Sequence, residues 1–531
     1  MNQTARLPWA IHAYSMAKPA LHTLTFRENR SMPKIPSPLR SIITNRSKLA
    51  SLLVILLPVL LVTLDNTILN FALPKIAVAL GPSAAEQLWA IDAYSLVLAG
   101  LLITMGSVGD RVGYRRLLCV GCSGFAIISV AIVFSQQAWH LIAGRAVLGL
   151  FGAMILPATL ALIRTAFDDR EERRLAVAAW ATCLTLGAAA GPLLGGVLLQ
   201  FFSWQSVFLV AVPFLLPVLL LSPMIEESPR QAGLSIDYPS ILLSLGAMTG
   251  VMLSLKHLAT VGLDTYAIVG MLTGLLMGIA FVRRQLALED PLLDLSLFDS
   301  NAFSVSITVN LVSLGALIGF LFFATQLLQL VLGLSPIAAS LILVPGQVCA
   351  VAAGLAIVPI AQRVAPSVVI PACLCVAAGA FAVMALFTAT ALIVAVAFVL
   401  LNAAVAAITS VSNDLVLSAV PAEKAGSASS VSETAYEVGV VLGTTVVGGA
   451  VAAWYRLSLV LPEGVGDEAD ALTATLGGAH SLAQDLPAEV GKELAQAANA
   501  AFSEGVTVAS GLVAGLIVVF ALYACRGLRR G

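Results

Sequence analysis

Long apolar runs separated by short polar connections fill the chain from about residue 49 onward. Each run is about 17–25 residues long, the length that an α-helix needs to cross roughly 30 Å of hydrocarbon. The runs lie at about 49–73, 88–107, 117–135, 139–161, 175–200, 205–221, 239–258, 265–282, 303–325, 336–360, 367–388, 390–413, 427–452 and 505–525. This pattern predicts an all-α integral membrane protein with 14 transmembrane helices.

Composition agrees with this class of protein. Of the 531 residues, 59% are hydrophobic and only 11% are charged, whereas ordinary globular domains carry about 25% charged residues. The seven cysteines are scattered through apolar stretches without the spacing of a disulfide framework or a zinc site, so we expect no bound metal. No basic stripe indicates a nucleic acid partner.

Basic residues lie mostly on one side of the predicted spans. An even number of spans places both termini on the same side. If that side is the cytoplasm, it holds 23 of the 28 Lys and Arg residues, as the positive-inside rule requires. The segment 1–48, which we expect to be a disordered arm with an alternative start at Met32, and the tail 526–531 are then cytoplasmic. The basic residues left on the outer side are Lys75, Lys256, Arg456 and Lys492.

Acidic residues interrupt several apolar runs. Asp65 lies well inside the run 49–73, where a charged side chain costs at least about 2.5–3.5 kcal/mol. The other acids within spans are Asp92, Glu433 and Glu437, against the single basic residue Arg145. A surplus of acids suits protons or cationic cargo. Simpler interpretations remain: Asp92 is wetted at the outer end of its helix, Glu437 is a structural hydrogen-bonding group, and Arg145 forms a structural ion pair.

Glycines mark a short loop and two helices. The loop Gly106–Arg116 has room for a tight reversal, and Asp110 can pair there with a helix end or an arginine and so hold one conformation. Arg145 lies on a glycine-lined face of the run 139–161, which permits close helix approach. In the run 175–200, Gly187, Gly191 and Gly195 recur every four residues, and Pro192 bends the helix.

These motifs resemble those of the major facilitator superfamily. The loop fits G-x-x-x-D-R-x-G-x-[RK]-[RK], the Arg145 segment is similar to the superfamily's fourth-helix motif, and Gly187–Gly196 is similar to its antiporter motif, which is associated with exporters. The segments 64–74, 88–95, 202–208 and 426–439 narrow the resemblance to the 14-span drug:proton antiporter family, specifically quaternary-ammonium exporters of the QacA and SmvA type.

The resemblance implies a fold, a function and roles for individual residues. The fold would be two six-helix bundles, 49–221 and 303–525, with two inserted helices in 222–302. The chain would be a proton-coupled antiporter in the bacterial cytoplasmic membrane that exports quaternary ammonium compounds, dyes and biguanides by alternating access. It would need no cofactor, because the proton gradient drives it. We expect a monomer whose partners are cations and protons, and an accessory periplasmic protein is left open.

The expected roles divide the residues into three groups. Cation binding is expected at Asp65, Glu433 and Asp92. Proton coupling is expected at Glu433, Glu437, Asp65 and Arg145, because the fourth-helix arginine of proton-coupled members interacts with a titrating carboxylate. Conformational roles are expected at Gly106, Asp110, Arg111, Gly113, Arg115, Gly187, Gly191, Pro192 and Gly195. In one departure, the stretch 343–350 lacks the extra acid that such exporters can carry, so handling of divalent cations stays open.

Two other functions remain as alternatives. The same transporter could export an endogenous metabolite such as an amino acid or a siderophore. An intramembrane enzyme is more remote: Gly121–Gly124 reads GxSG, as in rhomboid-type proteases, but no histidine lies deep in a span to serve as its base. We therefore predict a transporter and no catalytic residues.

The last outer loop, 454–503, is long, acidic and rich in alanine. Gly477 and Gly478 divide it into two candidate helices, the second with Leu486, Val490 and Leu494 at a helical spacing. We predict an extracytoplasmic helical hairpin, most simply a cap without chemistry.

Overall fold

The fold of the described residues is entirely helical. The computed structural model describes residues 45–228, 237–288, 291–420, 425–462, 465 and 473–529. Residues 1–44, which make up most of the predicted arm, lie outside this part. Fourteen helices are long and apolar enough to cross a membrane, which confirms the predicted number of spans. The chain is therefore a multi-pass membrane protein.

The first six spans are α4 (Arg46–Leu80), α5 (Ala84–Val112), α6 (Tyr114–Ile132), α7 (Ala138–Ala166), α8 (Arg170–Phe201), and α9 (Ser206–Leu209) with α10 (Ala211–Leu221) and η1 (Ser222–Met224). The seventh and eighth are α11 (Tyr238–Thr260) and α12 (Thr265–Ala287), followed by η2 (Leu295–Asp299). The last six are α13 (Asn301–Gln326) with η3 (Leu327–Val331), α14 (Pro336–Ala361), α15 (Pro366–Leu386), α16 (Ala391–Ser418), α17 (Ala425–Gly443) with η5 (Thr444–Gly448) and α18 (Gly449–Ser458), and α21 (Ala488–Gly527) after the short α20 (Leu476–Asp485).

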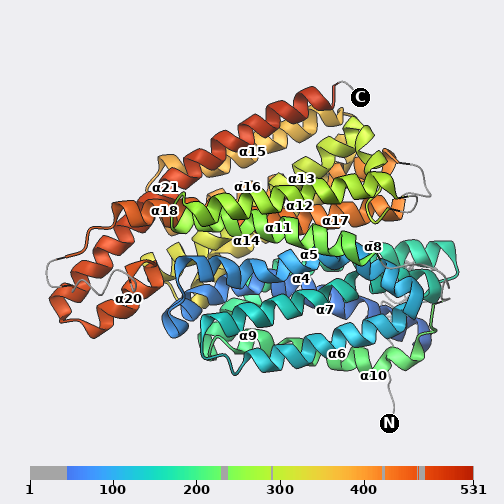
Figure 1. The fold of residues 1–531 in the computed structure, drawn as a ribbon, viewed down its shortest axis with the longest axis horizontal. Coiled ribbons are helices and arrows are strands. Elements are labelled where there is room, and N and C mark those ends of the chain that lie inside the picture. The colour runs from blue at the N-terminus through green and yellow to red at the C-terminus, as the bar shows by residue number, and fades with distance from the viewer. Residues whose placement is uncertain are drawn as a thin grey trace, which may run out of the picture.

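The spans pack as two groups with a pair between them. Helices of the first six spans, here called the first bundle, pack mainly on one another, and so do those of the last six, the second bundle. In Figure 1 the blue and cyan first bundle lies below the yellow to red second bundle, and α11 and α12 cross the middle. The two bundles meet where α5 packs on α17 and where α8 packs on α14.

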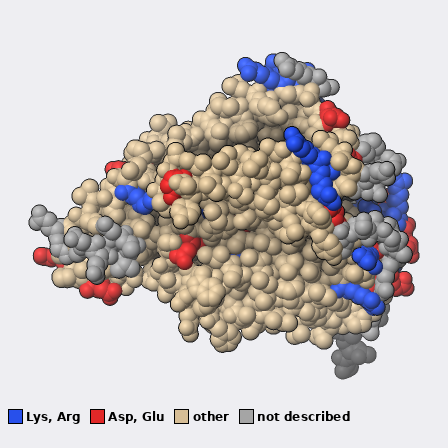
Figure 2. Space-filling view, in the orientation of Figure 1, with Lys and Arg blue, Asp and Glu red and all other residues tan. Residues whose placement is uncertain are grey.

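The two ends of the molecule differ. The terminal end is the one at which α21 ends, marked C in Figure 1, and the hairpin end is the one that carries α20. In the view of Figure 2, most of the visible Lys and Arg side chains gather toward the terminal end. At that end Lys48 Nζ lies 2.5 Å from Glu172 Oε2, joining the starts of α4 and α8.

The hairpin differs in detail from its prediction. Its second helix is the first part of α21, which continues without a break into the last span. Gly477 and Gly478 lie inside the first turn of α20 and do not divide the loop, because Thr475 caps that helix through its side chain. Gly477 also faces Ala77 of α4 so closely that an added Cβ would lie 2.5 Å from the Ala77 Cβ. The hairpin therefore packs against the first bundle, although it belongs in sequence to the second.

The inserted pair, α11 and α12, is held together by a polar contact at each end. Arg284 Nη2, in the last turn of α12, lies 2.8 Å from Asp237 Oδ1, which caps α11, and this hydrogen bond holds the pKa of Asp237 below its usual range. At the hairpin end, His257 Nε2 lies 2.9 Å from Asp264 Oδ2. Along the pair, Gly250 and Gly274 bring the helices into close contact. Large apolar side chains on α12 are exposed, as expected of a helix that faces lipid.

Candidate functional site

Asp65 and Arg145 form an ion pair in the interior of the first bundle. Asp65 Oδ2 on α4 accepts a hydrogen bond from Arg145 Nη1 on α7. Arg145 Nε donates to the Ala90 carbonyl at 3.2 Å, and the guanidinium lies 4.5 Å from the centroid of the Tyr94 ring. The side chains are 7% and 0% exposed, so each charge depends on the other for its counter-charge. Sequence motifs predicted that Arg145 meets a carboxylate but did not say which one.

A series of hydrogen bonds joins the two bundles, beginning at Asn66, the residue that follows Asp65 on α4. Asn66 Oδ1 accepts from Ser95 Oγ of α5 at 3.2 Å, and Asn66 Nδ2 donates to Glu437 Oε2 of α17 at 3.3 Å. Glu437 is only half-buried although it sits within a span and faces α4. Its carboxylate therefore lies at the contact between the bundles, where a change in their relative position must alter its surroundings.

Glu433 lies one helical turn before Glu437 on α17 and is also half-buried. Among the ion pairs of the described residues none involves Glu433. Nearby, Tyr436 Oη donates to Asn413 Oδ1 at 2.7 Å, and Asn310 Nδ2 donates to the same oxygen at 3.3 Å. The second bundle thus contributes both glutamates and an uncharged polar cluster to the interior.

Asp92 is buried and paired, which contradicts the simpler interpretation that it is wetted at a helix end. It is 0% exposed, and its Oδ2 lies 2.7 Å from Lys256 Nζ on α11. Thr444 Oγ1 donates to Asp92 Oδ1, and Thr445 Oγ1 donates to Oδ2 at 3.4 Å. Lys256 Nζ also lies 3.9 Å from the centroid of the Trp89 ring.

The placement of Lys256 on the outer side is likewise wrong. Its side chain is 1% exposed, inside the span Tyr238–Leu258. Proximity to the end of an apolar run led to the outer assignment, because a lysine there usually reaches the interface. Here Asp92 and the Trp89 ring on the neighbouring helix compensate its charge instead. Arg145 is therefore not the only basic residue buried within a span.

The loop between α5 and α6 is held within the first bundle. Tyr114 Oη donates to Asp110 Oδ1 at 2.8 Å and to the Gly106 carbonyl at 3.0 Å. Arg115 N donates to Glu227 Oε1 at 2.9 Å. Gly113 has φ +99°, and a Cβ there would lie 2.6 Å from the Glu227 carboxylate carbon, so this position needs glycine. The remaining motif residue, Arg111, is exposed.

Sequence reasoning missed Glu227 and Ser228. Ser228 Oγ accepts from the Tyr114 backbone N–H at 3.0 Å. Both residues follow the sixth span without belonging to any motif, so no local pattern pointed to them. Asp110 was predicted to pair with a helix end or an arginine, whereas in this structure it accepts a hydrogen bond from a tyrosine four residues away.

The glycine face of α8 has two sides with different partners. Within the first bundle, Cβ atoms at Gly187 and Gly191 would lie 1.9 and 2.0 Å from the hydroxyls of Thr63 and Thr67. Gly195 faces Ile68, and Pro192 is buried beside them. Gly196 points the other way: a Cβ there would lie 2.3 Å from Ser340 Oγ of α14, in the second bundle.

We expect Gly196→Leu to slow turnover by about tenfold or more while cation binding is retained, because the bundles can no longer meet at the hairpin end. Gly191→Leu is the matched variant. It collides with Thr67 inside the first bundle and should instead lower thermal stability. Dye efflux, dye affinity and thermal unfolding of both purified variants check this. Equal turnover in Gly196→Leu and wild type would contradict it.

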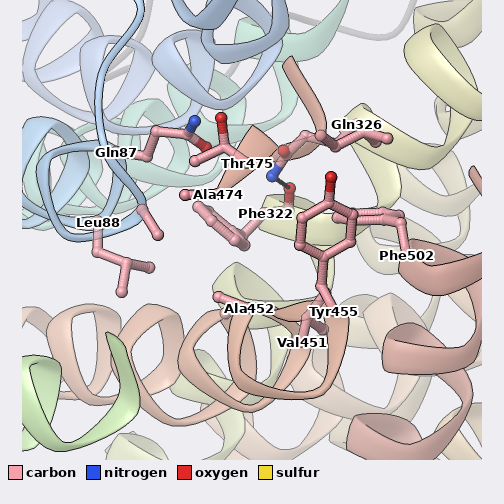
Figure 3. A pocket seen from close by; sticks show the side chains of 13 residues that line it. Gln87, Leu88, Phe322, Gln326, Val451, Ala452, Tyr455, Ala474, Thr475 and Phe502 are labelled. Carbon is pink, nitrogen blue, oxygen red and sulfur yellow. Dashed lines mark hydrogen bonds between the residues drawn. The ribbon is translucent and has the colours of Figure 1, made fainter. Parts of the chain in front are cut away.

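A small cavity lies at the hairpin end, between the bundles and under the hairpin (Figure 3). Gln87 and Leu88 of α5 line one side, Tyr455 and Phe502 line the other, and Thr475 lies next to Gln87. Tyr455 Oη donates to the Thr473 carbonyl at 3.1 Å. None of the four interior acids lines this cavity, so it is separate from the charged interior.

Two helical bundles with a pair of further spans between them are an architecture typical of secondary transporters. The chain matches the Major Facilitator Superfamily over residues 55–444 and belongs to that family. It is therefore a transporter and not an enzyme, as predicted.

Relatives and solved structures agree with this assignment. The chain is 45% identical to the multidrug efflux pump LfrA of Mycolicibacterium smegmatis, over 90% of this chain and 96% of the relative. It is 35% identical to the methyl viologen resistance protein SmvA of Salmonella typhimurium, over 89% and 96%. It is similar in fold to a bacterial homologue of the human lysosomal transporter Spinster in an inward-facing, unoccupied conformation, with TM-score 0.68 and 16% identity over 92% of this chain and 98% of that one.

Proposed function

We propose that this transporter exports lipophilic cationic drugs and antiseptics, such as quaternary ammonium compounds, dyes and biguanides, in exchange for protons. The observation that carries the proposal is the Asn66–Glu437 contact, which places a glutamate at the junction of the bundles. The pair Asp65–Arg145 adjoins it along α4. The relatives named as multidrug efflux and methyl viologen resistance proteins support a cationic cargo.

A shared acidic interior is enough to couple the two fluxes. A cation that enters favours the ionised form of a nearby carboxylate and releases its proton, and departure of the cation lets the proton return. Glu433 and Glu437 are the proposed proton carriers, because both are half-buried and lie one turn apart on the helix that contacts the first bundle. On this account the proton gradient is the energy source and no cofactor is needed.

The proposed orientation places the terminal end in the cytoplasm. Lys and Arg side chains gather toward that end (Figure 2), and cytoplasmic segments of membrane proteins are enriched in these residues. The hairpin end then faces outward, and export is release at that end.

Purified protein in liposomes with an imposed pH gradient tests the proposal. We expect uptake of ethidium or a quaternary ammonium dye against its own gradient, together with proton movement in the opposite direction. Uptake should stop when an ionophore collapses the pH gradient, and adding ATP should not restore it. Proton movement driven by amino acids or siderophores but not by cations would favour the alternative cargo. Cation movement without proton movement would contradict the coupling.

A further inference from the structure

The ion pair Asp92–Lys256 joins the inserted pair of helices to the first bundle, and its carboxylate also bonds to the second bundle. Asp92 belongs to α5 of the first bundle, and its two oxygens accept from the hydroxyls of Thr444 and Thr445 in η5 of the second bundle. Lys256 comes from α11, which itself packs on α5, η5 and α18. One carboxylate therefore connects three separate parts of the chain.

This contact occupies a defined level of the α5–α17 interface. Toward the terminal end, one turn along, Ser95 bonds to Asn66, which holds Glu437. Toward the hairpin end, one turn in the other direction, Leu88 packs against Gly448 beside the cavity of Figure 3. The ion pair thus lies between Glu437 and the hairpin-end cavity. Any cargo that passes from one to the other must cross this level.

Loss of either partner is unfavourable while the bundles meet at the hairpin end, here called the closed arrangement. Both side chains are buried to 1% exposure or less. A buried ion pair contributes little compared with apolar residues, but removing one partner leaves an uncompensated charge and is strongly unfavourable. When the bundles separate at the hairpin end, water reaches Asp92 and that penalty disappears. Loss of Lys256 therefore destabilises the closed arrangement more than the open one.

We propose that Lys256 is a positioning residue that holds Asp92 against η5 and so keeps the hairpin end of the transporter closed until this contact breaks. The inserted pair then supplies the cation of the contact that holds the two bundles together at the hairpin end. This contact, Lys256–Asp92–Thr444, is here called the latch. The inference goes beyond the proposed function, because it holds for any cargo that leaves at the hairpin end.

Hydrogen exchange of the full-length purified protein tests the latch without any cargo. In Lys256→Met, backbone amides of peptides that cover 84–92 and 444–455 should exchange at least about tenfold faster than in wild type. Peptides at the terminal ends of α8 and α14, covering 170–180 and 351–361, should exchange more slowly, because alternating access closes one end as it opens the other. Asp92→Asn should shift exchange in the same two directions.

Three further variants separate a latch from general stability. Lys256→Arg should restore the wild-type pattern, since it retains the charge. The double variant Asp92→Asn/Lys256→Met should open less than Lys256→Met, because it leaves no unpaired buried charge. Lys75→Met is the matched control: this half-buried lysine bonds to the Leu199 carbonyl within the first bundle, and its loss should leave the hairpin-end peptides unchanged.

Two results would overturn the inference. One is wild-type exchange at 84–92 and 444–455 in both Lys256→Met and Asp92→Asn. The other is faster exchange at both ends of the molecule together, which would show that the pair supports stability without favouring either arrangement. Because no substrate is present, failure here leaves the cation-export proposal unaffected, and failure of that proposal leaves this test valid.

Discussion

Glu433→Gln is expected to abolish the release of protons that a bound cation causes, while binding of at least one monovalent cation remains measurable. The amide keeps the shape of the side chain but has no proton to release. Glu433 is half-buried within a span, so its charge state should respond strongly to a cation nearby. A pH-sensitive dye in weakly buffered detergent solution measures the released protons, and fluorescence titration with ethidium measures binding.

Glu437→Gln and Glu504→Gln complete this series. Glu437 lies one turn away and bonds to Asn66, so its amide variant should reduce proton release and also loosen the contact between the bundles. Glu504 is an exposed glutamate of α21, and its variant should release protons as the wild type does. Undiminished release from Glu433→Gln would move the coupling role to Asp65, Asp92 or Glu437.

Asp65→Asn is expected to abolish transport of monovalent cations and to destabilise the first bundle. Sequence alone presents Asp65 as an isolated carboxylate, whereas the structure pairs it with Arg145. Removing one partner of a buried ion pair typically costs about 3–5 kcal/mol, because the other charge stays buried without compensation. Dye efflux from liposomes and thermal unfolding of the purified variant measure the two effects.

The double variant Asp65→Asn/Arg145→Gln separates the two contributions. It removes both charges, so most of the lost stability should return while transport stays absent. Glu172→Gln is the control: it leaves Lys48 without its partner, but the Lys48 side chain is 30% exposed, and a charge that water reaches loses little stability when it is unpaired, so this variant should be destabilised less than Asp65→Asn. Wild-type efflux in Asp65→Asn would remove this residue from the cation path.

The spans could be predicted because hydrocarbon thickness constrains them directly. Their ends could not, since several helices continue past the apolar run with polar residues that hydropathy excludes. The last span is the extreme case: it was predicted at 505–525, but its helix begins at Ala488. The apolar run reports only the length of helix that crosses the hydrocarbon, whereas backbone hydrogen bonding and the packing of the buried Leu494 continue the helix further.

The sequence could predict which acidic residues belong to the candidate site, but it could not predict which residues they pair with. Asp65, Asp92, Glu433 and Glu437 were recognisable because charge within an apolar run is costly. Their partners depend on which helices are neighbours, which no local pattern contains. Lys256 shows this most clearly, because only the packing of α11 against α5 distinguishes a buried counter-ion from an interfacial lysine.

The origin of Lys256 in the inserted pair constrains how this chain could be shortened. A twelve-span derivative that joins the sixth span directly to the ninth would keep both bundles and nearly all contacts between them. It would also leave Asp92 with the hydroxyls of Thr444 and Thr445 but without its cation. Deletion of the pair would therefore have to be accompanied by neutralisation of Asp92, so a designer who shortens this chain must change the two helices and this acid together.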